Sequence, residues 1–296
     1  MAGEFAFIDW IRAQAGRATG VVVPPGDDLA VLEWAAGDLL VVGVDQVLDG
    51  VHFDSAVHTP RQIGRKVMNR NLSDCAAMAC LPAAALATVA APRGAGVDYL
   101  KELFHGLRDA ADPWSCPVVG GDTGSWGGKL AVTVTILGRG AGVTPVTRRG
   151  ARPGDGVFVT GPLGGSPLGR HMTFRPRIEL ARGLAAAGAV TSMIDLSDGL
   201  SRDVGHLCRQ SGVGVVIDAE RVPIHPDAHE AARRDRRGPL EHALHDGEDY
   251  ELLYTGPTET NPGERCVGAV VAGPGVWLRS PAGTVPLEPL GWEHAL

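Results

Sequence analysis

Aspartates that follow glycines recur along the sequence, and their side chains are the first candidates for chemistry. Gly26-Asp27-Asp28 follows two prolines and precedes an apolar stretch, so it predicts a tight turn carrying two adjacent carboxylates. Gly120-Gly121-Asp122-Thr123 follows the apolar Pro117 to Val119 and predicts a strand that ends in glycines and a carboxylate. Carboxylate oxygens suit Mg²⁺, and glycines let a phosphate approach the backbone closely. Either segment alone could also be an ordinary solvated turn.

Asp45 follows the apolar segment Leu39 to Val44, which predicts a strand buried on both faces with this carboxylate at its carboxyl end. The loop that comes next presents His52. An aspartate in this position can simply cap the following turn, or it can bind a ligand, because loops at strand ends often carry binding groups. Asp45 and His52 are therefore candidate site residues.

Asp74 lies on a helix predicted from Pro60 to Ala79, on one face with Asn71 and Met78. A carboxylate on an otherwise apolar helix face needs a cation or strong hydrogen bonds, because burying it bare is costly. Asn71 and Ser73 could supply part of that support. Two interpretations remain open, a metal ligand and a hydrogen-bonded structural carboxylate.

The second half of the chain contains two further acidic segments. Asp195-Leu196-Ser197-Asp198 comes just before a predicted helix, so Ser197 or Asp198 could cap its first turn, whereas Asp195 is not needed for capping. Gly247-Glu248-Asp249 leads into a predicted strand and could be only an exposed strand edge.

Groups that could contact a phosphate are few. The loop Gly161 to Gly165 follows a predicted strand and could cradle a phosphate through its amides, or form a plain turn. Arg148 and Arg149 are the nearest basic candidates, if they are not simply solvated. The sequence contains no P-loop, no protein-kinase motif set and no strand-following GxGxxG, so the common nucleotide-binding folds are not indicated.

The composition excludes several classes of protein. A net charge of −7 gives no basic surface for nucleic acid or for an anionic membrane. No secretory signal is recognisable, and the longest apolar run, Cys80 to Pro92, is shorter than the roughly 18 residues of a membrane span. Five cysteines without a CxxC pair argue against a disulfide framework or a structural zinc site, and they favour the reducing cytoplasm.

Short β-branched runs alternate with longer helical patterns, which predicts an α/β or α+β chain. Strands are expected at Leu39 to Val44, Pro117 to Val119, Leu130 to Leu137, Val157 to Thr160, Val213 to Ile217 and Leu252 to Tyr254. Helices are expected at Phe5 to Ala15, Pro60 to Ala79, Val97 to Ala111, Arg177 to Ala187, Leu200 to Ser211 and Asp227 to Arg236. The segment 138–156, rich in glycine, proline and arginine, predicts a boundary between an N-terminal domain (1–140) and a C-terminal domain (150–296).

The order of these motifs resembles the thiamine-monophosphate kinase family over essentially the whole chain. Asn71-Leu72-Ser73-Asp74 and Ile194-Asp195-Leu196-Ser197-Asp198-Gly199-Leu200 are the most discriminating pieces, and Gly291-Trp292-Glu293-His294 closes the series. The resemblance implies the two-domain fold of aminoimidazole ribonucleotide synthetase, with an N-terminal sheet that pairs with its copy in a homodimer and ATP between the domains. It implies ATP- and Mg²⁺-dependent phosphorylation of thiamine monophosphate to thiamine diphosphate, with no nucleic-acid or membrane partner.

The same resemblance implies roles for individual residues. The magnesium ligands would be Asp28, Asp45, Asp74, Asp122, Asp195 and Asp198; the nucleotide would contact Gly121, Arg148 and Ser197; and thiamine monophosphate would contact His52, Glu248 and Trp292. Because the acceptor is itself a phosphate, already ionised near neutral pH, no general base is expected and direct in-line transfer depends on positioning and charge neutralisation.

Three features depart from the family pattern. Ala79-Cys80 stands where the family has a glycine, Pro24-Pro25 precedes the first aspartate pair, and the segment between Gly165 and Arg177 is short. Two alternatives remain, another ATP-dependent enzyme of the same superfamily or a catalytically silent protein that binds nucleotide or thiamine phosphate. The retained aspartates argue against the silent protein, since unneeded carboxylates in one site would repel each other.

Overall fold

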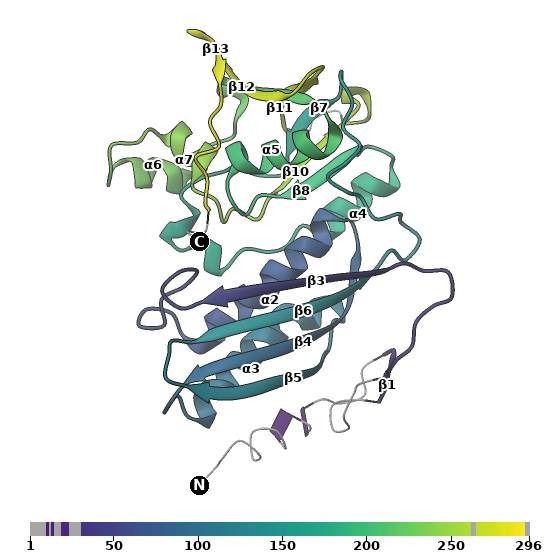
Figure 1. Cartoon of the computed structure of the whole chain (residues 1–296), viewed down its shortest axis with the longest axis vertical. Coiled ribbons are helices and arrows are strands. Elements are labelled where there is room, and N and C mark those ends of the chain that lie inside the picture. The colour runs from purple at the N-terminus through teal and green to yellow at the C-terminus, as the bar shows by residue number, and fades with distance from the viewer. Residues whose placement is uncertain (1–9, 12, 15–18, 24–30, 262–264, 294–296) are drawn as a thin grey trace. The chain divides into compact units, whose positions relative to one another are not determined.

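The computed structural model describes residues 10–11, 13–14, 19–23, 31–261 and 265–293. The chain forms two compact units, Met1–Cys75 with Cys80–Gly142, and Ala76–Ala79 with Val143–Leu296. Each unit is built on a sheet of its own (Figure 1). The helix expected from Phe5 to Ala15 lies largely outside the described residues, and so does Gly26-Asp27-Asp28.

The first unit is a four-stranded sheet in the order β3-β6-β4-β5. Its strands are β3 (Leu40–Leu48), β4 (Leu81–Pro92), β5 (Val118–Trp126) and β6 (Ala131–Arg139). β6 pairs antiparallel with β3 and β4, while β4 and β5 run parallel. Helices α2 (Pro60–Ala77) and α3 (Val97–Ala111) lie behind this sheet in Figure 1, and a short pair, β1 (Val21–Val23) with β2 (Val31–Leu32), precedes it.

Helices α2 and α3 touch backbone to backbone. A Cβ placed on Gly64 of α2 would lie 2.1 Å from the carbonyl oxygen of Leu103, and one placed on Gly106 of α3 would lie 2.1 Å from that of Arg61. Real side chains do not come this close, so both positions require glycine. The close crossing fixes α2, which carries Asp74, against the rest of the unit.

The expectation that β3 is buried on both faces is wrong for the single chain. Leu40, Val42 and Val44 are 52%, 59% and 63% exposed, whereas Val47 is fully buried. Because side chains alternate along a strand and the helices cover one face of this sheet, the residues of the other face remain accessible. That face is apolar although it is exposed.

The alanine-rich run Cys80 to Pro92, whose sequence pattern predicts neither helix nor strand, forms strand β4. Alanine favours helices intrinsically, but here β6 pairs with the run on one side and β5 on the other, so tertiary pairing overrides the propensity. Some side chains of β4, including those of Ala84 and Ala85, are fully buried.

The second unit contains a seven-stranded mixed sheet in the order β13-β12-β9-β11-β7-β10-β8. Its strands are β7 (Gly156–Val159), β8 (Ser192–Asp195), β9 (Gly214–Asp218), β10 (Leu252–Gly256), β11 (Arg265–Val271), β12 (Gly275–Ser280) and β13 (Gly283–Pro286). Its helices are α4 (Ile178–Ala186), α5 (Leu200–Ser211), α6 (Pro226–Ala232) and α7 (Pro239–His245). Leu200, Val204 and Leu207 of α5 pack into the core formed with strand residues such as Val159 and Leu253.

The expected helices Val97 to Ala111 and Leu200 to Ser211 have the observed bounds. The other expected elements within the described residues agree to within a few positions, except that β5 continues from the expected end at Val119 as far as Trp126. The sequence patterns do not predict strands β1, β4, β8 and β11 to β13 or helix α7. Among the described residues, no helix is both long and apolar enough to cross a membrane.

Substituting Gly106→Ala should lower the free energy of unfolding by about 1–3 kcal/mol, because the new methyl group would collide with a backbone carbonyl that cannot move alone. The matched control is Gly183→Ala in helix α4, where an added Cβ meets no atom within 4 Å. That change should be neutral or raise stability by up to about 1 kcal/mol through helix propensity. Urea unfolding followed by circular dichroism compares them, and equal effects would contradict the close crossing.

Candidate functional site

Asp45 and Asp74 approach each other where strand β3 packs against helix α2. A Cβ placed on Gly43 would lie 3.9 Å from Asp74 Oδ2, and Asp45 follows two residues later on the same face of β3. Arg70, one turn before Asp74, donates from Nε to Asp45 Oδ2 at 3.0 Å. Two carboxylates therefore share this neighbourhood with one guanidinium group.

The expectation that Asp45 and Asp122 follow the ends of their strands is wrong. Strand β3 continues to Leu48, and β5 continues to Trp126, so both carboxylates lie within strands. The reason is the ladder itself, since β3 pairs with β6 without interruption as far as Leu48. Backbone pairing extends each strand past its polar residue.

Asp122 lies far from Asp45 within one chain. Asp45 pairs with Val134, Val134 with Ala87, and Ala87 with Gly121, so the two aspartates belong to opposite edges of the sheet. Three spacings between neighbouring strands amount to roughly 14 Å, which is too far for one magnesium ion to bridge. Asp122 is also exposed.

Gly121 is required by the sheet itself. A Cβ at this position would lie 1.9 Å from the carbonyl oxygen of Ala87 in the neighbouring strand. Packing against strand β4 therefore requires the glycine whether or not a nucleotide binds. The lack of a side chain would also let a nucleotide approach the backbone.

His52 is buried, and its ring orientation is fixed by the backbone. Its Nδ1 accepts a hydrogen bond from the amide of Leu48 at 3.0 Å, so a neutral ring carries its proton on Nε2 and presents a donor there. The fully buried Lys66 of α2 donates from Nζ to the carbonyl oxygen of His52. Lys66 thus holds the loop that carries this candidate residue, a contact that the sequence did not predict.

Asn71 does not use its amide group to support Asp74. Its Nδ2 donates to the carbonyl oxygen of Val67 at 3.0 Å, and its buried Oδ1 has no hydrogen-bond donor among the described residues. Asn71 precedes Asp74 by three residues and so lies on the same helix face. Carboxylate and amide oxygens of this kind fit the oxygen preference of Mg²⁺.

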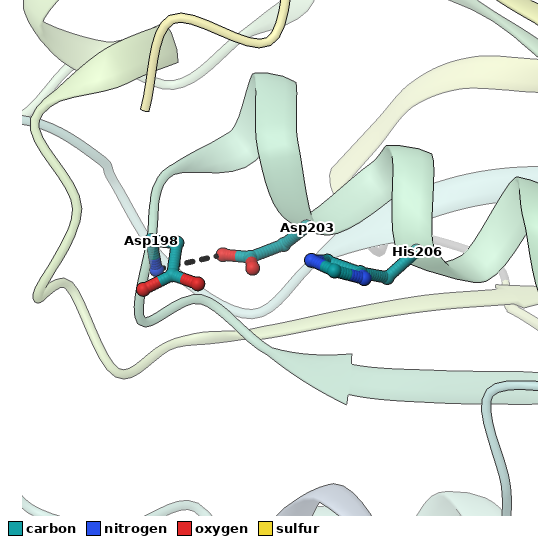
Figure 2. A group of neighbouring side chains, drawn as sticks. All are labelled: Asp198, Asp203 and His206. Atoms are coloured by element: carbon teal, nitrogen blue, oxygen red, sulfur yellow. Dashed lines mark hydrogen bonds between the residues drawn. The ribbon is translucent and has the colours of Figure 1, made fainter. Parts of the chain in front are cut away.

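In the second unit, the turn before helix α5 and the helix itself bring Asp198, Asp203 and His206 together. Figure 2 shows Asp203 lying between Asp198 and His206, and the amide of Asp198 donates to Asp203 Oδ2 at 3.1 Å. Ligand atoms of Asp198, Asp203 and His206 lie within 4.8 Å of one another. Burial raises the pKa of the Asp203 carboxyl well above its ordinary value, and the charges of Asp198 and Asp195 raise it further.

Crowded carboxylates of this kind suit a divalent cation, because the ion relieves repulsion that the protein otherwise bears. Arg148 belongs to the same surroundings. Burial lowers the pKa of His206, and the positive charges of Arg209 and then Arg148 lower it further, so the Arg148 guanidinium lies within electrostatic range of this histidine. The predicted nucleotide-contacting arginine and the acidic turn therefore share one region.

The capping interpretation of Ser197 and Asp198 is not what the structure shows. Gly199 is the N-cap of α5 and makes no side-chain capping bond. Instead Asp203 reaches back from the helix to the amide of Asp198. The sequence reasoning missed Asp203, although it shares the apolar face of Leu200, Val204 and Leu207, the same signal that singled out Asp74.

Two distant segments attach to this turn through its carbonyl oxygens. Glu248 donates its amide to Ser197 at 2.8 Å, and Trp292 donates its amide to Asp198 at 2.9 Å. Gly291 is necessary here because its Cβ would lie 2.0 Å from the Asp198 oxygen. Asp195 completes the group at the end of β8, where it pairs with Leu252 of β10.

Comparison with known proteins defines the class first. Family models for AIR synthase related protein match the chain, the N-terminal domain over residues 26–140 and the C-terminal domain over residues 155–255. The two-domain fold implied by the sequence resemblance is thereby confirmed.

Individual relatives narrow the assignment. A curated thiamine-monophosphate kinase of Rhodopirellula baltica is 38% identical and covers 93% of this chain and 92% of its own. The crystal structure of thiamine-monophosphate kinase from Stenotrophomonas maltophilia has a TM-score of 0.81 at 30% identity, covering 93% of this chain and 96% of that one. The structure of AaThiL complexed with AMPPCP and TMP has a TM-score of 0.80 at 31% identity, with coverages of 99% and 97%. This chain belongs to the thiamine-monophosphate kinase family, as its motifs predicted.

Magnesium should stabilise the protein against unfolding, because a cation bound to the folded carboxylates favours the folded state. At ten times its dissociation constant, the gain should be about 1.4 kcal/mol relative to a sample treated with a chelator. The change Asp198→Ala should remove much of this gain. Thermal unfolding with and without Mg²⁺ measures it.

The matched control is Asp218→Ala, which removes a carboxylate that is paired with Arg279. This variant should retain the full response to Mg²⁺. Equal losses in the two variants, or no response in the unmodified protein, would contradict the assignment of a magnesium site to the turn at Asp198.

Proposed function

We propose that this chain phosphorylates thiamine monophosphate with ATP, yielding thiamine diphosphate and ADP. The observation that carries the proposal is the attachment of two distant chain segments to the turn at Ser197 and Asp198, which gathers Glu248 and Trp292 beside the acidic group. Membership of the thiamine-monophosphate kinase family supports it, as does the relative that is complexed with AMPPCP and TMP.

The carboxylates that we assign to magnesium come from both units. They are Asp45, Asp74, Asp122, Asp195 and Asp198, together with Asp28, which lies outside the described residues. Magnesium, when bound, offsets the negative charge of the nucleotide phosphates and of the transferred group. The positive charge of Arg70 offsets part of the negative charge of Asp45 even without a metal.

The remaining assignments follow from the chemistry of each group. Arg148 offers a planar set of donors suited to phosphate oxygens, and Gly121 and Ser197 would let the nucleotide approach the backbone. We assign the Nε2–H of His52 as a donor to the acceptor. Trp292 is 48% exposed and offers an indole face for a heteroaromatic ring, while Glu248 offers a carboxylate.

No general base is needed for the transfer. The acceptor oxygen belongs to a phosphate monoester whose second pKa is about 6, so it is largely ionised at neutral pH. The task of the protein is then to hold donor and acceptor phosphates in line and to reduce their repulsion. We propose direct transfer without a phosphorylated enzyme.

We further propose that the protein acts in the cytoplasm. Its five cysteines are all free, and four of them are buried. Burial raises the pKa of the Cys116 thiol to about 12 and that of Cys208 to about 11, which keeps these thiols protonated and unreactive. Free thiols of this number are typical of a reducing compartment.

The direct test is incubation with ATP, Mg²⁺ and thiamine monophosphate, followed by chromatographic detection of thiamine diphosphate. Asp74→Asn or Asp198→Asn should each reduce the rate by at least about 100-fold, since each removes a charge that holds the metal. The circular dichroism spectrum should be unchanged in both variants, and Asp218→Asn should keep full activity.

Three other outcomes would count against the proposal. Binding of both ligands without product would indicate the silent binding protein. Transfer to a different acceptor only would indicate another ATP-dependent enzyme of the superfamily. A stable phosphorylated protein after incubation with labelled ATP alone would rule out direct transfer.

We also propose that two copies of the chain form a homodimer through the first unit, and that each site uses carboxylates of both copies. The exposed apolar residues Leu40, Val42 and Val44 of β3 provide a surface that a second copy can cover. Asp45 and Asp122 lie on opposite edge strands of one sheet. In a two-fold dimer, the β3 edge of one copy can meet the β5 edge of its partner, which would bring these carboxylates together.

Subunit mixing tests this arrangement. Asp45→Asn and Asp122→Asn homodimers should each be inactive, but after mixed refolding the heterodimer should contain one intact site. With statistical assortment, activity should return to about a quarter of the unmodified level. Static light scattering checks the dimer, and mixed samples that stay inactive while forming heterodimers would show that each chain builds its site alone.

A further inference from the structure

The loop that carries Glu248 has an unusual backbone. Glu248 and Tyr250 have φ angles of 54° and 52°, in the left-handed region that disfavours residues with side chains. Two backbone hydrogen bonds hold it, since the amide of Glu248 donates to Ser197 and that of Tyr250 donates to Leu196. The strain is therefore maintained by the same turn that carries Asp198.

The short segment between Gly165 and Arg177, which departs from the family pattern, packs against this loop. It forms two 3₁₀ turns, η2 (Ser166–Leu168) and η3 (Arg170–Met172). Ser166 Oγ donates to the carbonyl oxygen of Glu248 at 2.6 Å, and Arg170 Nη2 donates to Asp249 Oδ1 at 2.9 Å. The shortened segment thus acts as a support for the loop.

Two more contacts complete this support. The rings of Phe174 and Tyr250 stack with centroids 3.9 Å apart, and Arg177 Nε donates to Glu251 Oε2 at 2.9 Å. Together with Ser166 and Arg170, these residues engage every position from Glu248 to Glu251. Ser166 binds the backbone of the loop, and the other three residues bind its side chains.

His171 contacts the Glu248 carboxylate itself, whose other oxygen accepts a hydrogen bond from the Tyr250 hydroxyl at 3.4 Å. The Nδ1 of His171 lies 2.8 Å from Glu248 Oε2, with the two side chains 9% and 22% exposed. The histidine is the more buried partner of this pair. A hydrogen bond to a charged group of this kind restricts the rotamers that the carboxylate adopts.

We propose that His171 is a positioning residue for the acceptor, acting through Glu248. The imidazole holds the Glu248 carboxylate in the orientation that receives thiamine monophosphate, while Ser166 holds the backbone of Glu248 and Arg170 holds the neighbouring Asp249 side chain. This inference rests on the proposed function, in which Glu248 contacts the acceptor.

The first test is steady-state kinetics of His171→Leu, which keeps an apolar side chain of similar size but removes the hydrogen bond. Its KM for thiamine monophosphate should rise at least about tenfold, because a hydrogen bond to a charged group is lost. Its KM for ATP should stay within about twofold, because no nucleotide contact is changed. His171→Asn keeps a donor near the same place and should recover part of the loss.

A matched control separates this effect from general destabilisation. Thr255 is fully buried in β10 of the same unit, and its Oγ1 hydrogen-bonds with Ser192. Thr255→Val removes a buried polar contact remote from Glu248 and should leave both KM values unchanged. A similar rise in the KM for the acceptor in this variant would overturn the inference.

A double-mutant cycle tests whether His171 acts through Glu248. In a Glu248→Ala background, adding His171→Leu should change the KM for the acceptor by less than about twofold, because the group it orients is gone. Fully additive effects, or an equal rise in the KM for ATP, would show that His171 does not act as proposed.

Calorimetric titration with thiamine monophosphate keeps this inference distinct from the proposed function. If the unmodified protein binds thiamine monophosphate but forms no product, the proposed function fails, and the dissociation constants of the same variants then test His171. Absence of both binding and product would overturn both.

Discussion

The hydrogen bond from the Asp198 amide to the buried Asp203 carboxylate is the contact on which the rest of the second unit's site depends. It shapes the turn between β8 and α5, and that turn exposes the carbonyl oxygens of Leu196, Ser197 and Asp198. The loop at Glu248 and the segment at Trp292 attach to these oxygens. One buried acceptor therefore sets the positions of residues that are far apart in the sequence.

This contact brings an electrostatic cost. The Asp203 carboxyl is buried close to Asp195 and Asp198, and both charges disfavour its ionised form. Hydrogen bonds from backbone amides lower the pKa of Asp203, but they do not cancel the increase. A bound cation would offset the repulsion between these carboxylates. The same cluster that destabilises the protein without a cation can therefore serve a site that binds phosphates.

In the first unit, the repulsion between carboxylates is reduced in a different way. Asp74 also lies on a helix face that packs against a sheet, but Gly43 leaves space beside it, and Arg70 partly neutralises Asp45. Here the protein supplies a positive charge of its own. The two acidic groups therefore differ in how much they depend on a metal, although both rest on carboxylates placed by a helix.

How much of this could be read from the sequence varies from residue to residue. Helical periodicity located α3, α5 and the face of Asp74, because that signal is local. Asp203 carries the same signal, but it lies one turn inside a helix that Asp195 and Asp198 already precede. The local sequence pattern does not predict where the strands that contain Asp45 and Asp122 end, because pairing with β6 and β4 sets those ends. Local pattern does not predict β4 either, because its alanine-rich segment forms a strand by pairing with the strands on both sides.

The short segment at 165–177 shows why a departure from a family pattern need not mean loss of function. The sequence shows this segment only as a shortening of the family pattern. In the structure, its side chains make successive contacts with Glu248 to Glu251, a loop that two left-handed residues would otherwise make unfavourable. A strained backbone persists only where its surroundings over-determine it. The number of residues in the segment matters less than whether each of its polar groups meets a partner on the loop.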